Sequence, residues 1–157
     1  MDENELSMCG IIGFLNKTKN STFVGKTVLQ MLNALGVRGP DSTGVALYGQ
    51  KRNKGMVAQI KLGQQKEATF IAKQLEEFGS VDEVKIIAEY LRLVINLKVD
   101  VVSFLKFVES LDQDIEVVSL GTQLEVVKQV GTPQNLESTY NISSFTGTHG
   151  LGHTRLS

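Results

Sequence analysis

The segment Cys9-Gly10-Ile11-Ile12-Gly13-Phe14-Leu15 is an apolar run with the length of one β-strand. Residues 1–8 precede it as a loose leader, and the polar cluster at 16–22 ends it. Because the strand is apolar on both faces, we expect other layers to cover it on both sides. This strand therefore predicts stacked layers, with sheets in the middle and helices outside.

The rest of the chain alternates helical and extended patterns without a regular strand–helix–strand rhythm. Apolar spacing and capping residues predict helices at about 23–35 and 66–78, from Val101 after Asp100, and from Pro133 after Thr132. Strands are expected at 44–48, 56–62, 115–120 and 124–130, the last two as a hairpin around Gly121-Thr122. The segment 84–97 fits both patterns, and its β-branched content favours a strand.

The composition excludes several classes of protein. The 157 residues include 16 basic and 17 acidic side chains, a near-neutral balance that argues against nucleic acid as the main partner. No run approaches the ~18 consecutive apolar residues of a membrane span. The leader is short and acidic, unlike a secretory signal or a transit peptide, so a cytoplasmic location is the default expectation.

Cys9 is the one cysteine of the chain, which excludes a disulfide within the chain and a cysteine-based zinc site. A lone cysteine is most simply a small buried hydrophobe. Its place directly after Met8, at the start of a strand, favours a second interpretation. If processing exposes Cys9 as the first residue, its α-amine, with a pKa of roughly 7.7–8.0, lies beside its thiol. Such an amine can activate a nucleophile without a separate histidine base.

Two further clusters suggest a site. Arg38-Gly39-Pro40-Asp41-Ser42-Thr43-Gly44 forms either an ordinary turn or a loop that brings the Arg38 cation near the thiol. In the closing segment, His149, His153 and Arg155 share parity, so they would face the same way in a strand. A metal site is disfavoured there, because no acidic or cysteine companion is close in sequence. The Arg155 guanidinium suits either a carboxylate ligand or a surface ion pair.

Together, Cys9–Gly13, Arg38–Gly44 and Gly152-His153-Thr154-Arg155 resemble the class II glutamine amidotransferase domain. That family belongs to the N-terminal nucleophile hydrolases, and the resemblance implies an α+β fold with a four-layer α/β/β/α sandwich. It covers residues 9–157, more weakly over a family-variable insert at about 80–131. The longer run from Gly131 to Arg155 is most similar to the amidotransferase subunit of archaeal-type glutamate synthases, then to glutamine phosphoribosylpyrophosphate amidotransferase.

The resemblance implies a role for each matching position. Cys9 would attack the side-chain amide of L-glutamine, Arg38 would order the loop, and Arg155 and His153 would bind the substrate. The thioester would be hydrolysed to glutamate, and ammonia would pass to synthase subunits. No cofactor is expected in this chain, because the flavin and iron–sulfur centres of glutamate synthases find no ligands in it.

Two departures qualify that expectation. Eight residues precede Cys9, so the leader must be cleaved, or translation must start at Met8. The family's Asn-Gly oxyanion pair lies beyond the Arg155 motif, so we expect a fold incomplete at its C-terminus. An oxyanion donor is worth ~10²–10³ in turnover, so we expect a poor glutaminase from this chain alone: a split-gene product with a separately encoded C-terminal part, a fragment, or a degenerate copy. The alternatives are a non-catalytic partner or regulatory module on this fold, and ammonia supply to a phosphoribosyl acceptor.

Overall fold

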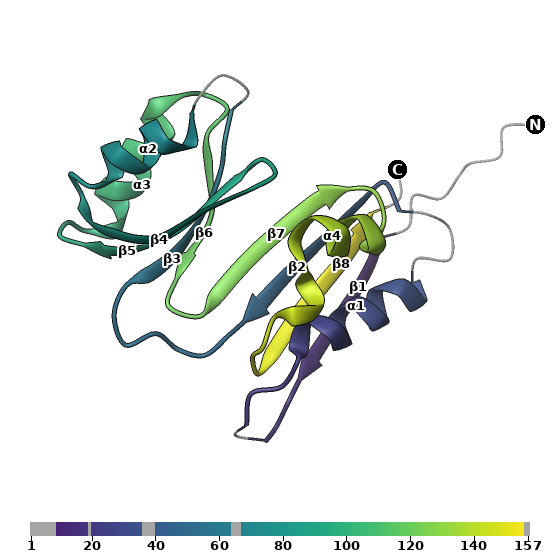
Figure 1. Ribbon diagram of the computed structural model, residues 1–157. Helices are drawn as coiled ribbons and strands as arrows, with labels where there is room; N and C mark the ends of the chain where they lie inside the picture. The colour runs from purple at the N-terminus through teal and green to yellow at the C-terminus, as the bar shows by residue number, and fades with distance from the viewer. Residues whose placement is uncertain (1–8, 19, 36–39, 64–66, 156–157) are drawn as a thin grey trace, which may run out of the picture. The chain divides into compact units, whose positions relative to one another are not determined.

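The computed structural model describes residues 9–18, 20–35, 40–63 and 67–155. They form two compact units, each with its own four-stranded antiparallel sheet (Figure 1). The first unit combines the chain up to Gln50 with the chain from Val127 onward. The second unit is Lys51–Val126. One strand of the first sheet precedes it in the sequence, and another strand of that sheet begins at its end.

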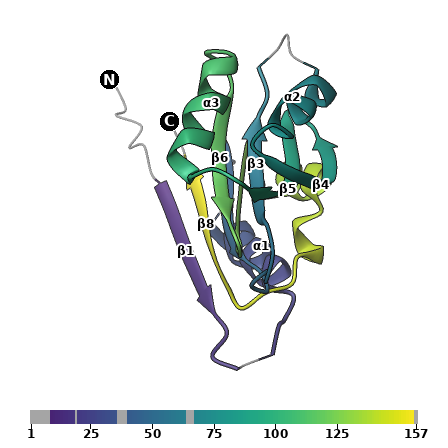
Figure 2. The same cartoon turned by 90° about the vertical axis from the view of Figure 1, so that its left-hand side faces the viewer.

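The first sheet has the strand order β1-β8-β2-β7. Its strands are β1 (Cys9–Leu15), β2 (Ser42–Tyr48), β7 (Leu124–Val130) and β8 (His149–Arg155). The last strand, β8, lies between β1 and β2 and runs antiparallel to both. Figure 2 shows β1 beside β8 at the edge of the sheet. This topology brings the first and last described strands side by side, so the motifs at the two ends of the sequence meet.

Helix α1 (Val24–Leu35) packs against one face of this sheet. Val24, Val28 and Leu32 recur every four residues and are fully buried, as expected for the inward face of an amphipathic helix. Gly152 of β8 permits the close approach, because a Cβ atom there would lie 2.8 Å from Leu32 Cδ2. On the other face of β1, the Ile11 side chain is 74% exposed.

Helix α4 (Pro133–Tyr140) and the 3₁₀ turn η1 (Ile142–Ser144) contact α1. Thr132 caps α4 by accepting a hydrogen bond from the Asn135 backbone N–H, and Pro133 occupies the first turn. The predicted start of this helix is therefore confirmed.

The second unit has the strand–helix–strand–strand–helix–strand order of a ferredoxin-like domain. Its elements are β3 (Met56–Lys61), α2 (Ala68–Leu75), β4 (Gly79–Ile87), β5 (Tyr90–Leu97), α3 (Val101–Leu111) and β6 (Glu116–Gly121). The sheet order is β4-β5-β3-β6. Its core joins buried residues of β3 and β5, such as Ile60 and Leu93, to Ile71 of α2 and Phe104 of α3. Asp100 caps α3 as predicted, by accepting from the Ser103 backbone N–H.

The predicted α+β content is confirmed, with two antiparallel sheets and four helices. The N-terminal nucleophile hydrolase class, its four stacked layers and the insert at about 80–131 stay predictions, and the leader 1–8 lies outside the described residues. No described helix combines the length and apolar character that crossing a membrane requires.

Two expectations about strands are wrong. The single strand at 84–97 is two strands, β4 and β5, joined by a turn at which Ala88 has a positive φ of 52°. Neither glycine nor proline marks that turn in the sequence. The pair 115–120 and 124–130 is not a hairpin of one sheet, because β6 pairs with β3 while β7 neighbours β2. The Gly121-Thr122 turn is local, whereas strand pairing depends on segments that are distant in the sequence.

Candidate active site

Cys9 and Arg155 lie directly opposite each other in the β1–β8 pair. Opposite residues of antiparallel strands project from the same face, with Cβ atoms about 4.5–5.5 Å apart. Both side chains are exposed, and Cys9 is a free thiol. The sheet therefore places a thiol beside a guanidinium, although 146 positions separate these residues in the sequence (155 minus 9).

The Arg155 guanidinium makes no ion pair with any described residue. In the second unit, by contrast, Arg52 and Arg92 are both paired with glutamate carboxylates. An arginine without an internal partner keeps its two parallel N–H donors for a ligand, and carboxylate is the group that matches this fork.

The same face of the sheet carries the other predicted residues of β8. Exposure alternates along β8, with His153 and Arg155 exposed and Gly152 and Thr154 buried. The expectation that His149, His153 and Arg155 share a face agrees with this alternation. His153 lies two residues before Arg155 on β8, on the same face, between Ile11 of β1 and Gly44 of β2.

The face favours an anionic ligand. The register places twelve residues of β1, β8 and β2 on it, and they include Arg155 and two histidines but no acidic side chain. They are Cys9, Ile11, Gly13, Leu15, His149, Leu151, His153, Arg155, Ser42, Gly44, Ala46 and Tyr48. A carboxylate that binds here meets positive charge and no repulsion from these three strands.

Hydrogen bonds hold the strand ends around Arg155. The Asp41 backbone N–H donates to the Arg155 carbonyl at 2.8 Å, and the Gly131 N–H donates to the Asp41 carbonyl at 2.8 Å. The Thr43 hydroxyl donates to the Gly131 carbonyl at 2.8 Å. On the buried face, a Cβ atom at position 10 would lie 2.7 Å from Thr154 Oγ1, so Gly10 allows β1 to pack closely there.

His149 is at the opposite end of β8 from the thiol. Its ring stacks on Tyr48 with centroids 4.1 Å apart, and its Nδ1 lies 2.9 Å from the Thr148 hydroxyl. It lies six positions along the strand from Arg155, roughly 20 Å at the rise of a strand. Within the described ranges, no three His, Cys, Asp or Glu side chains form a group that could hold a metal ion.

Arg38 lies outside the described residues. Ser42, which the sequence interpretation left in the turn motif without a role, lies opposite Arg155 on the β2 side. The strand was expected to begin at Gly44 and begins at Ser42, and the register that pairs Ser42 with Arg155 is not visible in the sequence.

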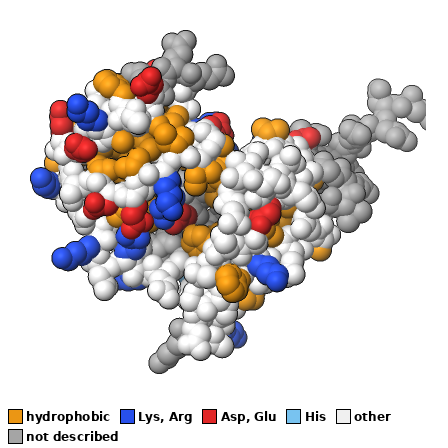
Figure 3. Space-filling view, in the orientation of Figure 1, with side chains coloured by type: hydrophobic (Ala, Val, Ile, Leu, Met, Phe, Trp, Pro, Cys, Tyr) orange, Lys and Arg blue, Asp and Glu red, His pale blue; other side chains and the backbone are white. Residues whose placement is uncertain are grey.

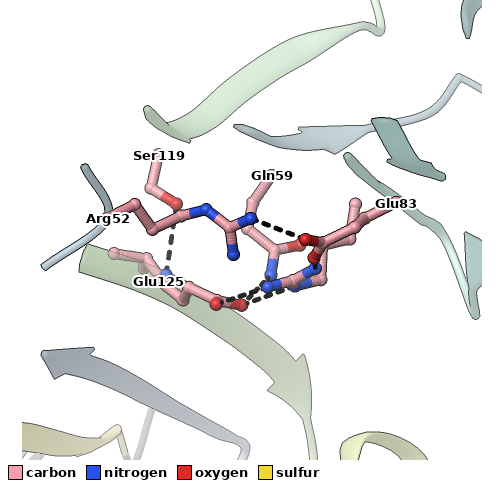
Figure 4. Close-up of polar contacts among 7 residues, drawn as sticks. Arg52, Gln59, Glu83, Ser119 and Glu125 are labelled. Carbon is pink, nitrogen blue, oxygen red and sulfur yellow. Dashed lines mark hydrogen bonds and ion pairs between the residues drawn. The ribbon is translucent and has the colours of Figure 1, made fainter. Parts of the chain in front are cut away.

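The second unit contains a polar cluster of structural character (Figure 4). Arg92 donates to both carboxylate oxygens of Glu125, at 2.8 and 2.7 Å, and both side chains are 16% exposed. The hydrogen bonds that Arg92 donates to Glu125 raise the pKa of Arg92, despite the opposing effect of burial. Arg52 donates to Glu83 at 2.6 Å, and this bond lowers the pKa of the Glu83 carboxyl.

All cations of this cluster are neutralised within it. Figure 3 shows the same mixture on the visible surface, where basic and acidic side chains lie close together over β3, β4 and β5. The cluster therefore offers no unpaired guanidinium of the kind that Arg155 presents.

The chain is similar to proteins named as glutamine amidotransferases. It is 29% identical over 153 residues to the glutamine amidotransferase-like protein GlxB of Rhizobium meliloti, covering 95% of this chain and 50% of that protein. It is also 29% identical over 160 residues to a provisionally named glutamine amidotransferase of Methanothermobacter thermautotrophicus, covering 96% and 52%. The chain thus spans about half the length of these relatives, and no family model matches it. The two similarities support a glutamine amidotransferase family.

Proposed function

We propose that this chain carries the nucleophilic cysteine and the substrate-binding arginine of a class II glutamine amidotransferase. That enzyme hydrolyses the side-chain amide of L-glutamine and supplies ammonia to a synthase. The observation that supports this most strongly is the register of Cys9 opposite Arg155, whose guanidinium makes no ion pair with any residue that the structure describes. The names of the two relatives support glutamine as the substrate.

The dimensions of the site fit an amino acid of this size. The amide carbon and the carboxylate carbon of extended glutamine are separated by four bonds, or about 5 Å when each bond is about 1.5 Å long. Neighbouring opposite side chains start about 5 Å apart. A glutamine that lies across β1 and β8 can therefore reach the Cys9 sulfur with its amide and the Arg155 guanidinium with its carboxylate.

The chemistry starts once Cys9 is the first residue. Its neutral α-amine accepts the thiol proton, and the sulfur attacks the amide carbon of glutamine. The protonated amine then returns the proton to the departing nitrogen, so ammonia leaves and a γ-glutamyl thioester remains. A water molecule, deprotonated by the same amine, attacks the thioester. Glutamate and the free thiol result, so the net reaction is glutamine plus water to glutamate plus ammonia.

The other residues have supporting roles in this proposal. Arg38 orders the loop beside the thiol, and His153, next to Arg155 on the exposed face of β8, contributes to substrate binding. The oxyanion donors come from a further part of the protein. Ammonia supply to glutamate synthase is the proposed destination, with a phosphoribosyl acceptor as the second candidate.

The test is covalent labelling of Cys9 by the glutamine analogue 6-diazo-5-oxo-L-norleucine, followed by mass spectrometry. The chain that begins at Cys9 should gain one adduct on this residue, and L-glutamine should protect it. Cys9→Ala should gain none. A chain that retains residues 1–8 should react roughly 10²-fold more slowly, because it lacks the amine base. Equal labelling with and without glutamine would favour a non-catalytic module on this fold.

A further inference from the structure

Ser42 is the side chain next to Arg155 on the side away from Cys9. The register pairs Cys9 of β1 with Arg155 of β8, and Arg155 with Ser42 of β2, so the three form one row across the sheet. Ser42 is half-buried at the first position of its strand. In the next row on the same face, the neighbour of His153 on β2 is Gly44, which has no side chain. Ser42 is therefore the hydroxyl that lies beside the Arg155 guanidinium.

The Ser42 hydroxyl is uncommitted, unlike the hydroxyl that follows it. Thr43 points to the other face, is 1% exposed, and uses its hydroxyl to donate to the Gly131 carbonyl. Within the described part of the chain, no group forms a hydrogen bond with the Ser42 hydroxyl. One of two adjacent hydroxyls thus stabilises the fold, while the other retains its donor on the exposed face.

The position of the row decides which end of the substrate Ser42 can reach. Adjacent strands lie about 4.7–4.9 Å apart, so the Cα atoms of Cys9 and Ser42 are separated by about 10 Å. An amide bound at the Cys9 sulfur is beyond the reach of a serine side chain at that separation. The end of the substrate held by Arg155, one strand away, is within its reach.

We propose that Ser42 is a substrate-binding residue, which donates a hydrogen bond from Oγ to the α-carboxylate that Arg155 holds. Arg155 would then bind the carboxylate from β8 and Ser42 from β2, while Cys9 acts on the amide from β1. The inference rests on the proposed function, and it assigns the recognition of the carboxylate to two strands.

The experiment measures the saturation of Cys9 labelling by 6-diazo-5-oxo-L-norleucine in the chain that begins at Cys9. Ser42→Ala should raise the half-saturating concentration about tenfold, the loss expected for one hydrogen bond to a charged group. The labelling rate at saturation should stay unchanged, because Ser42 does not touch the diazoketone that reacts with Cys9. Ser42→Thr keeps the hydroxyl and should restore the half-saturating concentration to within a few-fold of the parent.

Two controls separate this role from a structural one. The rate of Cys9 alkylation by iodoacetamide, which has no carboxylate, should be the same in all three proteins. Protection by L-glutamine should weaken in Ser42→Ala, whereas protection by L-glutaminamide, whose α-carboxylate is replaced by an amide, should not change.

The outcomes distinguish the two claims. An unchanged half-saturating concentration in Ser42→Ala would overturn this inference and leave the proposed function standing. If the rate of Cys9 alkylation by iodoacetamide in Ser42→Ala falls together with the rate of labelling by 6-diazo-5-oxo-L-norleucine, Ser42 has a structural role. That result would also overturn this inference and leave the proposed function standing. If the parent chain shows no glutamine-protected labelling of Cys9, the proposed function fails and this inference fails with it.

Discussion

Cys9, the first residue of β1, lies directly opposite Arg155, the last described residue of β8. The two strands come from the two ends of the chain, yet β8 is placed between β1 and β2 in the sheet. A thiol and a guanidinium are thus placed side by side by the pairing of two strands and not by a loop. Placement on paired strands is what holds such a site within the narrow tolerances that chemistry requires.

Gly152 should be intolerant of a side chain. In Gly152→Ala, the new Cβ would lie 2.8 Å from Leu32 Cδ2 and 2.9 Å from Ile12 Cδ1, and both neighbours are buried. We expect a loss of about 1–3 kcal/mol in the free energy of unfolding of the first unit. Denaturant unfolding monitored by circular dichroism measures this loss.

Gly13→Ala is the matched control on the exposed face of the same strand pair. Its nearest new contact is the Leu151 side chain at 3.2 Å, and that side chain is 52% exposed and can move. We expect little change in stability. Equal losses in Gly152→Ala and Gly13→Ala would contradict the close packing of α1 on β8.

The Arg92–Glu125 pair should stabilise the second unit far more than an exposed pair does. Glu125→Ala removes both acceptors from a guanidinium that is only 16% exposed. We expect a loss of about 2–3 kcal/mol, because a largely buried guanidinium loses both of its close acceptors and keeps only the longer ion pair with Glu83 at 3.7 Å. Glu89→Ala is the control, since Glu89 lies 3.8 Å from Lys61 in an exposed pair. Its loss should be below about 0.5 kcal/mol, and similar losses in the two variants would contradict the prediction.

The Asp100 cap should give the second unit a stability that depends on pH. Hydrogen bonds from the Ser103 side chain and then its backbone lower the pKa of Asp100 below its usual value. A lowered folded pKa means that the stabilisation is complete above the unfolded pKa, about 3.9, and is lost as the pH falls through the folded pKa. Asp100→Asn should therefore be less stable than the parent at neutral pH and equally stable in strong acid.

The titration of Asp100 by NMR provides the independent check. Ser103→Ala removes the largest cause of the shift, so the pKa of Asp100 should move back toward its ordinary value. A titration that is identical in the parent and Ser103→Ala would show that this hydrogen bond does not stabilise the carboxylate.

The second unit should fold when it is separated from the first. Lys51–Val126 contains a complete ferredoxin-like arrangement with its own core. At its ends, the Arg52 backbone N–H donates to the Thr122 carbonyl at 2.9 Å. Residues 51–126 alone should show cooperative thermal unfolding by circular dichroism, and a noncooperative profile would contradict this prediction.

The counterpart variant tests the first unit. Because β2 and β7 are neighbours in the first sheet, residues 51–123 can be replaced by an Asn-Gly turn, the dipeptide suited to a two-residue hairpin. This variant should keep the glutamine-protected labelling of Cys9. Loss of protection in a folded variant would mean that the second unit takes part in binding.

Local patterns predicted those elements whose causes are local. The continuous apolar run gave the bounds of β1, and Asp100 and Thr132-Pro133 marked the starts of α3 and α4. The split of 84–97 was missed because Ala88 adopts a left-handed turn that glycine or asparagine usually marks. The ferredoxin-like unit was missed for another reason, since its strand order depends on pairings between distant segments.

The candidate site, too, could be predicted from the sequence only in part. Cys9 and Arg155 could be proposed from residue chemistry and from the resemblance. The row that adds Ser42 required the register of three strands, because parity within one strand says nothing about its neighbours.

The most direct test of the central claim is the half-saturating concentration of 6-diazo-5-oxo-L-norleucine for Cys9 in Arg155→Ala, compared with the parent chain. The proposed site predicts an increase of about 10- to 100-fold, the loss of a charge-assisted carboxylate contact, with an unchanged rate of Cys9 alkylation by iodoacetamide. If Arg155→Ala and the parent saturate at the same concentration, Arg155 does not hold the substrate and the account is contradicted.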